Sequence, residues 1–196
     1  METMKRRTYQ LGRRAESADE TRRRLVQATF ELHGEQGIAA TTMKQIADRA
    51  GVGVGTVYHH FPALEDTVTA CALHVQQSMP MPTEAIFAGV GPMKERVLRL
   101  AGALFGYFDR VPHEIVLADQ DKIPMLKEVA AEEQKQRIAL TRAALAPFSV
   151  DRELIRVVAA LLDVGVYRSL QRTGLSLEQA TAAIADVVHA RLARKD

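Results

Sequence analysis

Apolar residues recur at spacings of three and four along most of this 196-residue chain, which is the spacing of helices that bury one face. In the first third of the chain they predict helices over residues 17–36, 43–49 and 54–60. No segment alternates between apolar and polar residues as a half-buried strand does. The pattern therefore predicts an all-α fold.

Capping residues set the limits of these three helices. Thr42 and Gln45 form a T-x-x-Q capping box before the second helix, and a similar box at Ser17 opens the first. Gly51 and Gly53 form a sharp turn after the second helix, since glycine accepts left-handed backbone. The third helix has only about two turns, so it needs support from the other two.

Beyond residue 61 the pattern predicts longer helices that stop at proline or glycine. Their expected ranges are 63–78, 83–90, 92–110, 125–146, 151–173 and 176–193, with one or two further turns within 113–120. The whole chain is thus expected to hold about nine helices.

The second and third helices, with the glycine turn between them, have the spacing of a helix-turn-helix. The third is small and polar at Gly55 and Thr56, where another molecule can approach closely, and then carries the hydrogen-bonding groups of Tyr58, His59 and His60. A recognition helix in a DNA major groove needs such a surface. The alternative is a structural hairpin in which these side chains only cap and pack.

The segment from Thr42 to Phe61 resembles the DNA-binding domain of the TetR (tetracycline-repressor-like) family, whose pattern T-x-x-x-I-A-x-x-A-G-V-x-x-G-x-x-Y-x-H-F it matches. The resemblance implies that the chain binds double-stranded operator DNA. We expect base contacts from Val54, Gly55 and Thr56, and phosphate contacts from Thr42, Lys44, Tyr58, His59 and His60.

The chain departs from the family pattern at two places. His33 stands where a phenylalanine is usual, and we interpret it as a partly buried packing residue. Ala63 and Leu64 stand where the family usually has a small capping residue and a lysine that reaches a phosphate. The charged contact at the start of that helix is therefore missing.

The charge distribution supports a nucleic-acid partner more than the net charge of +2 does. Residues 1–62 carry ten Lys/Arg against seven Asp/Glu, a net charge of +3. Residues 1–16 form a basic arm that we expect to be flexible and to lie along phosphates or in a minor groove. A disordered tail that only improves solubility explains the same composition.

The resemblance divides the chain into the arm (1–16), a helix-turn-helix domain (17–62) and a larger helical domain for ligand binding and dimerisation (63–196). Two helices at the end of the chain carry more apolar residues than one buried face requires, so we expect them to form a four-helix bundle with a second copy. The predicted interface residues are Leu154, Val158, Leu161, Ile184, Val187 and Val188. The alternative is a monomer that buries these residues itself.

The middle of the chain is rich in methionine and aromatic residues between proline breaks. TetR-like proteins generally bind a small-molecule inducer in this region, so we expect an apolar pocket there. The predicted lining residues are Met79, Phe87, Leu104, Phe105, Phe108, His113 and Met125. Any one of them is equally explained as ordinary core.

The sequence gives little support for an enzyme, a metalloprotein or a membrane protein. The chain has no G-x-S-x-G, Walker or H-E-x-x-H motif, so we expect no enzyme activity, no metal and no cofactor. Its single cysteine, Cys71, and its lack of a long apolar segment favour a cytoplasmic protein without a membrane partner. The prediction is a homodimeric, ligand-responsive repressor of a pseudo-palindromic operator. The alternative is a helical small-molecule-binding or scaffolding dimer with a vestigial DNA-binding head.

Overall fold

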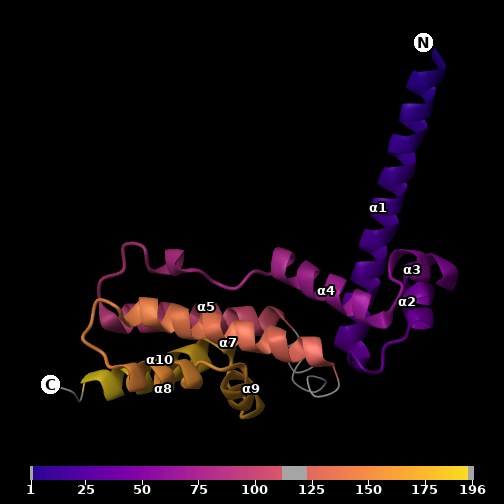
Figure 1. Cartoon of the computed structure of the whole chain (residues 1–196). Coiled ribbons are helices and arrows are strands. Elements are labelled where there is room, and N and C mark those ends of the chain that lie inside the picture. The colour runs from indigo at the N-terminus through magenta and orange to yellow at the C-terminus, as the bar shows by residue number, and fades with distance from the viewer. Residues whose placement is uncertain (1, 112–122, 194–196) are drawn as a thin grey trace. The chain divides into compact units, whose positions relative to one another are not determined.

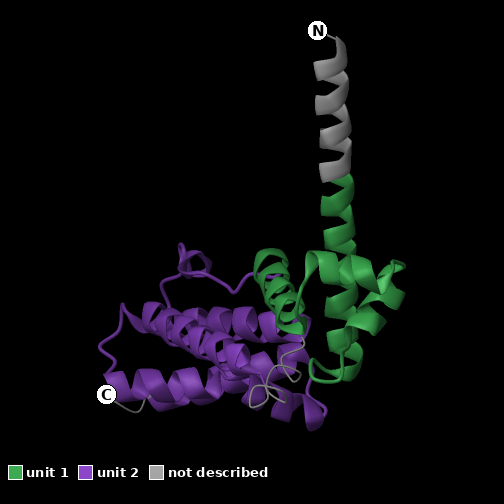
Figure 2. Cartoon of the chain, turned by 45° about the vertical axis from the view of Figure 1, so that its right-hand side comes forward, with its two compact units in different colours: residues 1–78 green, residues 79–196 purple. Residues whose placement is uncertain are grey.

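The computed structural model describes the backbone of residues 2–111 and 123–193, and the side chains of 16–111 and 123–191. Every regular element in these ranges is helical, which confirms the all-α prediction (Figure 1). The chain forms two compact units, Met1–Ser78 and Met79–Asp196 (Figure 2). Unit 1 holds four helices: α1 (Glu2–Gln36), α2 (Met43–Ala50), α3 (Val54–His60) and α4 (Leu64–Ser78).

Each of these helices contributes to one apolar core in unit 1. Leu25 of α1, Ile46 of α2 and Val57 of α3 are fully buried, and Phe61 lies with them directly after α3. Ala70 of α4 belongs to the same cluster. Since α4 closes this core, the boundary predicted after residue 62 falls inside compact unit 1.

The first helix begins earlier than the sequence predicts. α1 starts at Glu2, so the start expected at the Ser17 capping box is wrong, and residues 2–16 of the predicted arm form the first part of α1. The carbonyl of Ser17 accepts a 2.8 Å hydrogen bond from the hydroxyl of Thr21, one turn further along. Residues 2–16 contain no proline, so nothing in this segment forces a helix to stop.

Unit 2 is a bundle of helices around α5. The elements in its described residues are η1 (Glu84–Phe87), α5 (Met93–Arg110), α7 (Pro124–Leu145), α8 (Arg152–Leu161), α9 (Val164–Arg172) and α10 (Leu177–Ala193). The helix predicted over 83–90 is thus a single 3₁₀ turn, and the turns expected within 113–120 lie outside the described residues. α5 packs against both α7 and α10 (Figure 1).

Buried side chains of α5 hold this bundle together. The ring of Phe105 stacks on Tyr167 of α9, with centroids 4.8 Å apart. Arg96 is also buried, and its guanidinium donates to the carbonyls of Ala144 at 2.7 Å and Val90 at 2.9 Å while it lies over the ring of Phe87. This one side chain therefore joins α5 to the end of α7 and to the segment after η1.

The single helix predicted over 151–173 is wrong, because the structure has two helices there. α8 ends at Leu161, and α9 begins after Asp163, whose carboxylate accepts a 2.8 Å hydrogen bond from the Gly165 N–H. The same carboxylate binds Arg137 of α7 at 2.6 Å. Asp163 therefore starts a new helix and is held in place by a neighbouring one.

Candidate nucleic-acid interface

The turn between α2 and α3 is built by local interactions that the sequence predicts. The Thr42 hydroxyl accepts a hydrogen bond from the Gln45 N–H at 3.3 Å, and the Gln45 side chain accepts one from the Thr42 N–H at 2.9 Å. The predicted capping box is thus confirmed. Gly51 ends α2 with φ of 67°, the left-handed conformation that favours glycine.

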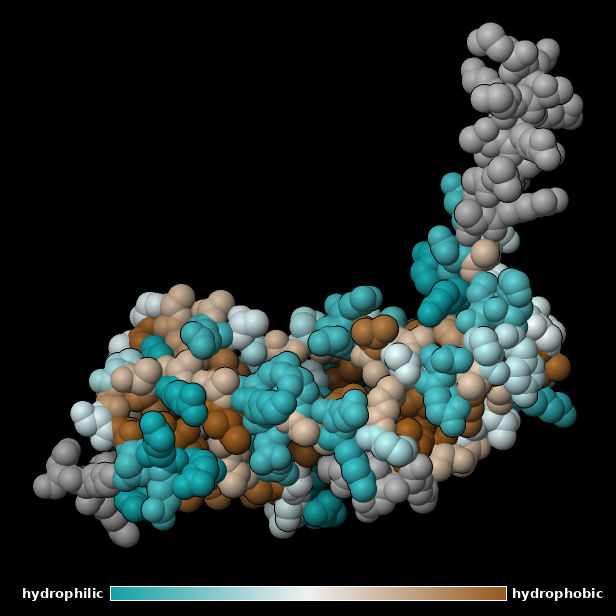
Figure 3. All heavy atoms as spheres, in the orientation of Figure 1, coloured by the Kyte–Doolittle hydropathy of each residue, from teal (hydrophilic) through white to brown (hydrophobic). Residues whose placement is uncertain are grey.

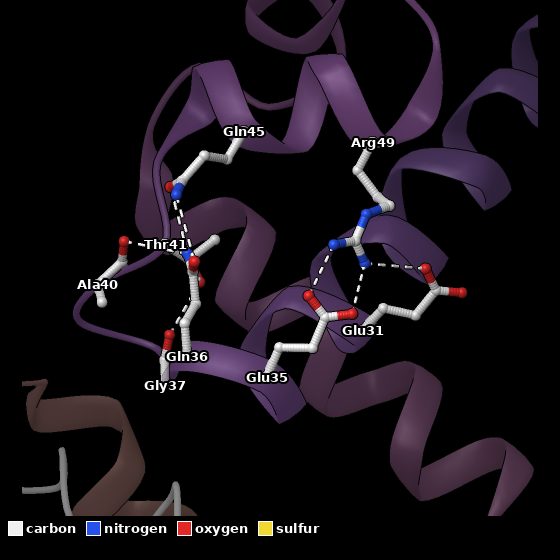
Figure 4. Close-up of polar contacts among 8 residues, drawn as sticks. All are labelled: Glu31, Glu35, Gln36, Gly37, Ala40, Thr41, Gln45 and Arg49. Atoms are coloured by element: carbon white, nitrogen blue, oxygen red, sulfur yellow. Dashed lines mark hydrogen bonds and ion pairs between the residues drawn. The ribbon is translucent and has the colours of Figure 1, made fainter.

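Polar side chains fix α2 against the end of α1 (Figure 4). Arg49 binds the Glu35 carboxylate through two nitrogens, at 2.9 and 2.7 Å, and reaches Glu31 at 3.4 Å. The Arg49 hydrogen bond lowers the pKa of Glu35 below its usual value. At the other end of α2, Gln36 donates to Gln45 at 3.2 Å. These contacts set the orientation of the helix that precedes the recognition helix.

α3 has one buried residue, Val57, and its other residues are exposed or half-buried. Val54 and Tyr58 are 45% and 52% exposed, although both are large and apolar or aromatic. Gly55 and His59 are exposed as well. Such a surface suits a helix that docks into another molecule rather than one that only completes the core.

The structure brings the other predicted DNA-binding residues to the surface of the same unit. Thr42 and Lys44 are exposed at the start of α2, and Thr56 and His60 are half-buried on α3. The rings of His59 and His60 meet edge to face, with centroids 5.4 Å apart. Burial, followed by the charges of His59 and Arg22, lowers the pKa of His60, so this imidazole is neutral at pH 7.

The two departures from the family pattern have structural explanations. His33 is buried in unit 1, more fully than the partly buried packing residue that the sequence predicts. Leu64 is half-buried against the core of unit 1. The N–H of Ala63 donates a 2.9 Å hydrogen bond to the carboxylate of Asp66. A side chain of α4 therefore caps the first turn of its own helix.

Most of the residues predicted to line a ligand pocket are core residues of unit 2. Phe87, Leu104, Phe105 and Phe108 are buried. Phe105 and Phe87 already have partners, the ring of Tyr167 and the guanidinium of Arg96. The two methionines of the set, at positions 79 and 125, are half-buried, and the histidine at 113 lies outside the described residues.

The predicted dimer residues fall into two groups. Leu154, Val158, Ile184 and Val188 are buried within the chain, and Leu161 is half-buried. Val187 of α10 and Val157 of α8 are instead 55% and 47% exposed. On the face of the molecule drawn in Figure 3, brown apolar atoms likewise show between the teal polar atoms of unit 2. No helix in the described part of the chain is long and apolar enough to cross a membrane.

Known proteins are similar to part of unit 1 in sequence and to most of the chain in fold. Residues 25–71 match the family model described as bacterial regulatory proteins, tetR family. The regulator BetI of Rhizobium meliloti is 26% identical over 182 residues, which cover 87% of this chain and 89% of BetI. The regulator SrpR of Pseudomonas putida is 47% identical over 47 residues, which cover 24% of this chain and 22% of SrpR.

Two solved structures extend this likeness to both units. EbrR, a multidrug-binding protein solved with malachite green, is 25% identical, with a TM-score of 0.62 over 87% of this chain and 96% of EbrR. NalD, a repressor of a multidrug efflux pump in Pseudomonas aeruginosa, has the same fold at 18% identity, with a TM-score of 0.64 over 89% of this chain and 96% of NalD. Because the helix-turn-helix geometry, the family model and these relatives agree, residues 25–71 form a helix-turn-helix domain of the tetR family, and the chain resembles transcriptional regulators of that family along most of its length.

Proposed function

We propose that this regulator is a homodimeric repressor that leaves a pseudo-palindromic operator when a small molecule binds unit 2. The observation that carries the proposal is the outward face of α3, where Val54, Gly55 and Tyr58 are exposed on a helix with a single buried residue. The proposed activity is binding and release, with no catalysed reaction.

The proposed DNA contacts follow from the chemistry of the exposed groups. Val54 offers an apolar contact to a thymine methyl group, and Gly55 and Thr56 offer close backbone approach and a hydroxyl. The hydroxyls of Thr42 and Tyr58 would donate hydrogen bonds to phosphates. The side chains of Lys44, His59 and His60 would bind phosphates through charge or hydrogen bonds.

Dimerisation is proposed through α8 and α10. Val157 and Val187 expose apolar surface on these helices, while Val158 and Val188 hold the helices on their own unit. An isologous pairing of this surface gives a two-fold axis. A two-fold axis also fits an operator whose half-sites lie about 34 Å apart.

The ligand is proposed to be a small, largely apolar molecule bound in unit 2. Support comes from the aromatic residues of α5 and from EbrR, which has been solved with malachite green bound. A thermal-shift screen that includes this dye tests the proposal. A ligand that binds should raise the melting temperature and also release DNA.

The direct test is fluorescence anisotropy with a labelled duplex taken from beside the coding sequence, titrated in parallel with a scrambled duplex. We expect the natural duplex to bind at least about a thousandfold more tightly, the lower end of specific recognition. Equal, weak binding to both duplexes by a dimer that still responds to ligand would favour the helical scaffold with a vestigial head.

A further inference from the structure

Three successive arginines of α1 have three different surroundings. The guanidinium of Arg24 donates to the carbonyl of Ala50 at the end of α2. Arg23 pairs with Glu20 of its own helix at 2.7 Å. Arg22 lies over the ring of Phe61, with its guanidinium carbon 4.7 Å from the ring centroid. Because successive helical residues point about 100° apart, each arginine serves a different side of α1.

Of these three arginines, Arg22 is the one whose side chain lies beside the end of the recognition helix α3. Phe61 directly follows α3, and its ring is 6.5 Å from that of His60. The Arg22 charge also acts on His60, where it helps to keep the imidazole neutral. Arg22 itself is exposed, and among the side chains that the structure describes no carboxylate pairs with it.

We infer that Arg22 binds a DNA phosphate beside the end of α3, in place of the charged contact that is missing at position 64. This inference rests on the proposed function. The stacking on Phe61 holds the planar guanidinium beside α3 while its edge stays available, and guanidinium groups bind phosphate through two parallel hydrogen bonds.

The start of α4 cannot supply this cation. Leu64 packs on the core, and the first turn of α4 carries the acidic residues Glu65 and Asp66. The imidazole of His60 is kept neutral by burial and by its basic neighbours, so it offers a hydrogen bond but no charge. Arg22 is thus the described side chain that brings full positive charge to this end of the recognition helix.

The test compares Arg22→Gln with the wild-type protein in anisotropy titrations over a range of salt concentrations, with the natural and the scrambled duplex. We expect binding to both duplexes to weaken about tenfold, as for loss of a hydrogen bond to a charged group. The slope of log K against log salt should fall by about 0.9 per subunit. Arg22→Lys keeps the charge and should retain most of the slope.

Arg23→Gln is the matched control, since it removes a neighbouring arginine that is paired on another side of α1. It should leave the salt slope unchanged. The inference is overturned if Arg22→Gln keeps the wild-type slope, if only the natural duplex is bound more weakly, or if the melting temperature falls and Arg22→Lys restores neither quantity. Failure of the wild-type protein itself to prefer the natural duplex would instead contradict the proposed function.

Discussion

Gly55 is the second residue of α3, at a position where packing gives no reason for a glycine. A Cβ built there meets no atom within 4 Å, and glycine in a helix costs about 1 kcal/mol relative to alanine. On the outward face of a recognition helix, a missing side chain allows the backbone to approach DNA closely. At this position, glycine therefore lowers the stability of the helix but favours DNA binding.

We expect Gly55→Ala to raise the free energy of unfolding by about 0.5–1 kcal/mol and to weaken DNA binding. Chemical denaturation and anisotropy measure the two effects separately. Gly51→Ala is the contrast, because φ is 67° there and the added Cβ would lie 3.3 Å from an Arg24 nitrogen. It should lower both stability and binding. Unchanged DNA affinity of Gly55→Ala would remove Gly55 from the interface.

Tyr58→Phe removes one hydroxyl from the exposed face of α3 and keeps the ring. We expect DNA binding to weaken by about 1–2 kcal/mol, because the phosphate loses a hydrogen bond. Anisotropy measures the change, and the melting temperature should stay at its wild-type value since the side chain is 52% exposed. Wild-type affinity would place Tyr58 outside the DNA contact.

Leu64→Lys restores the residue that the family usually has at this position, yet we expect it to destabilise this chain. Leu64 packs on the core of unit 1, and its replacement should cost about 1 kcal/mol. The salt slope of DNA binding should stay unchanged. Chemical denaturation measures the loss of stability, and titration at several salt concentrations measures the salt slope of DNA binding. A steeper salt slope at wild-type stability would show that position 64 faces a phosphate.

Among the elements, the break between α8 and α9 depends most on a contact from elsewhere in the fold. The Asp163 side chain caps α9 and also binds Arg137 of α7, whose side chain is only 12% exposed. Without Asp163, the α9 N-terminus would lose its cap and a largely buried cation would lose its partner. This one residue caps α9 and ties the start of that helix to α7.

Asp163→Ala should lower the free energy of unfolding of unit 2 by about 2 kcal/mol, through loss of the cap and the ion pair. Asp163→Asn keeps an oxygen that can cap the helix and removes only the charge, so it should cost less. Thermal and chemical denaturation of both variants give the comparison. Equal, small losses in both would mean that neither contact stabilises the break.

At the scale of the whole molecule, assembly is proposed to depend on the two valines that stay exposed on α8 and α10. Val157 and Val187 are 47% and 55% exposed, whereas Val158 is buried in its own chain. A charge at Val158 would unfold unit 2 rather than test the dimer. The exposed pair therefore provides a cleaner test.

We expect the double variant Val157→Glu, Val187→Glu to be a folded monomer that binds operator poorly, because a dimer interface would bury unpaired carboxylates. Sedimentation measures the mass, and circular dichroism checks the fold. Leu73→Glu, on an exposed residue of unit 1, is the matched control and should remain dimeric. An intact dimer in the double variant would place the interface elsewhere.

Elements whose limits depend on neighbours within about four residues could be predicted from the sequence. The Thr42 and Gln45 capping box, the turn at Gly51 and the range of α3 all appear as predicted. A similar capping box opens α10, where the Ser176 N–H donates to the Gln179 side chain at 2.9 Å and the Gln179 N–H donates to the Ser176 hydroxyl at 3.2 Å. These interactions are local, so residue types at fixed spacing are enough to specify them.

Features that join residues far apart in the chain depend instead on how the helices pack. The ion pair of Asp163 with Arg137 lies at a break in a segment whose apolar pattern alone predicts one helix. The packing of Leu64 and the stacking of Arg22 on Phe61 likewise depend on how α1, α3 and α4 meet. Periodicity identifies an apolar face, but contacts between helices determine which side chains on that face are buried and which remain available to a partner.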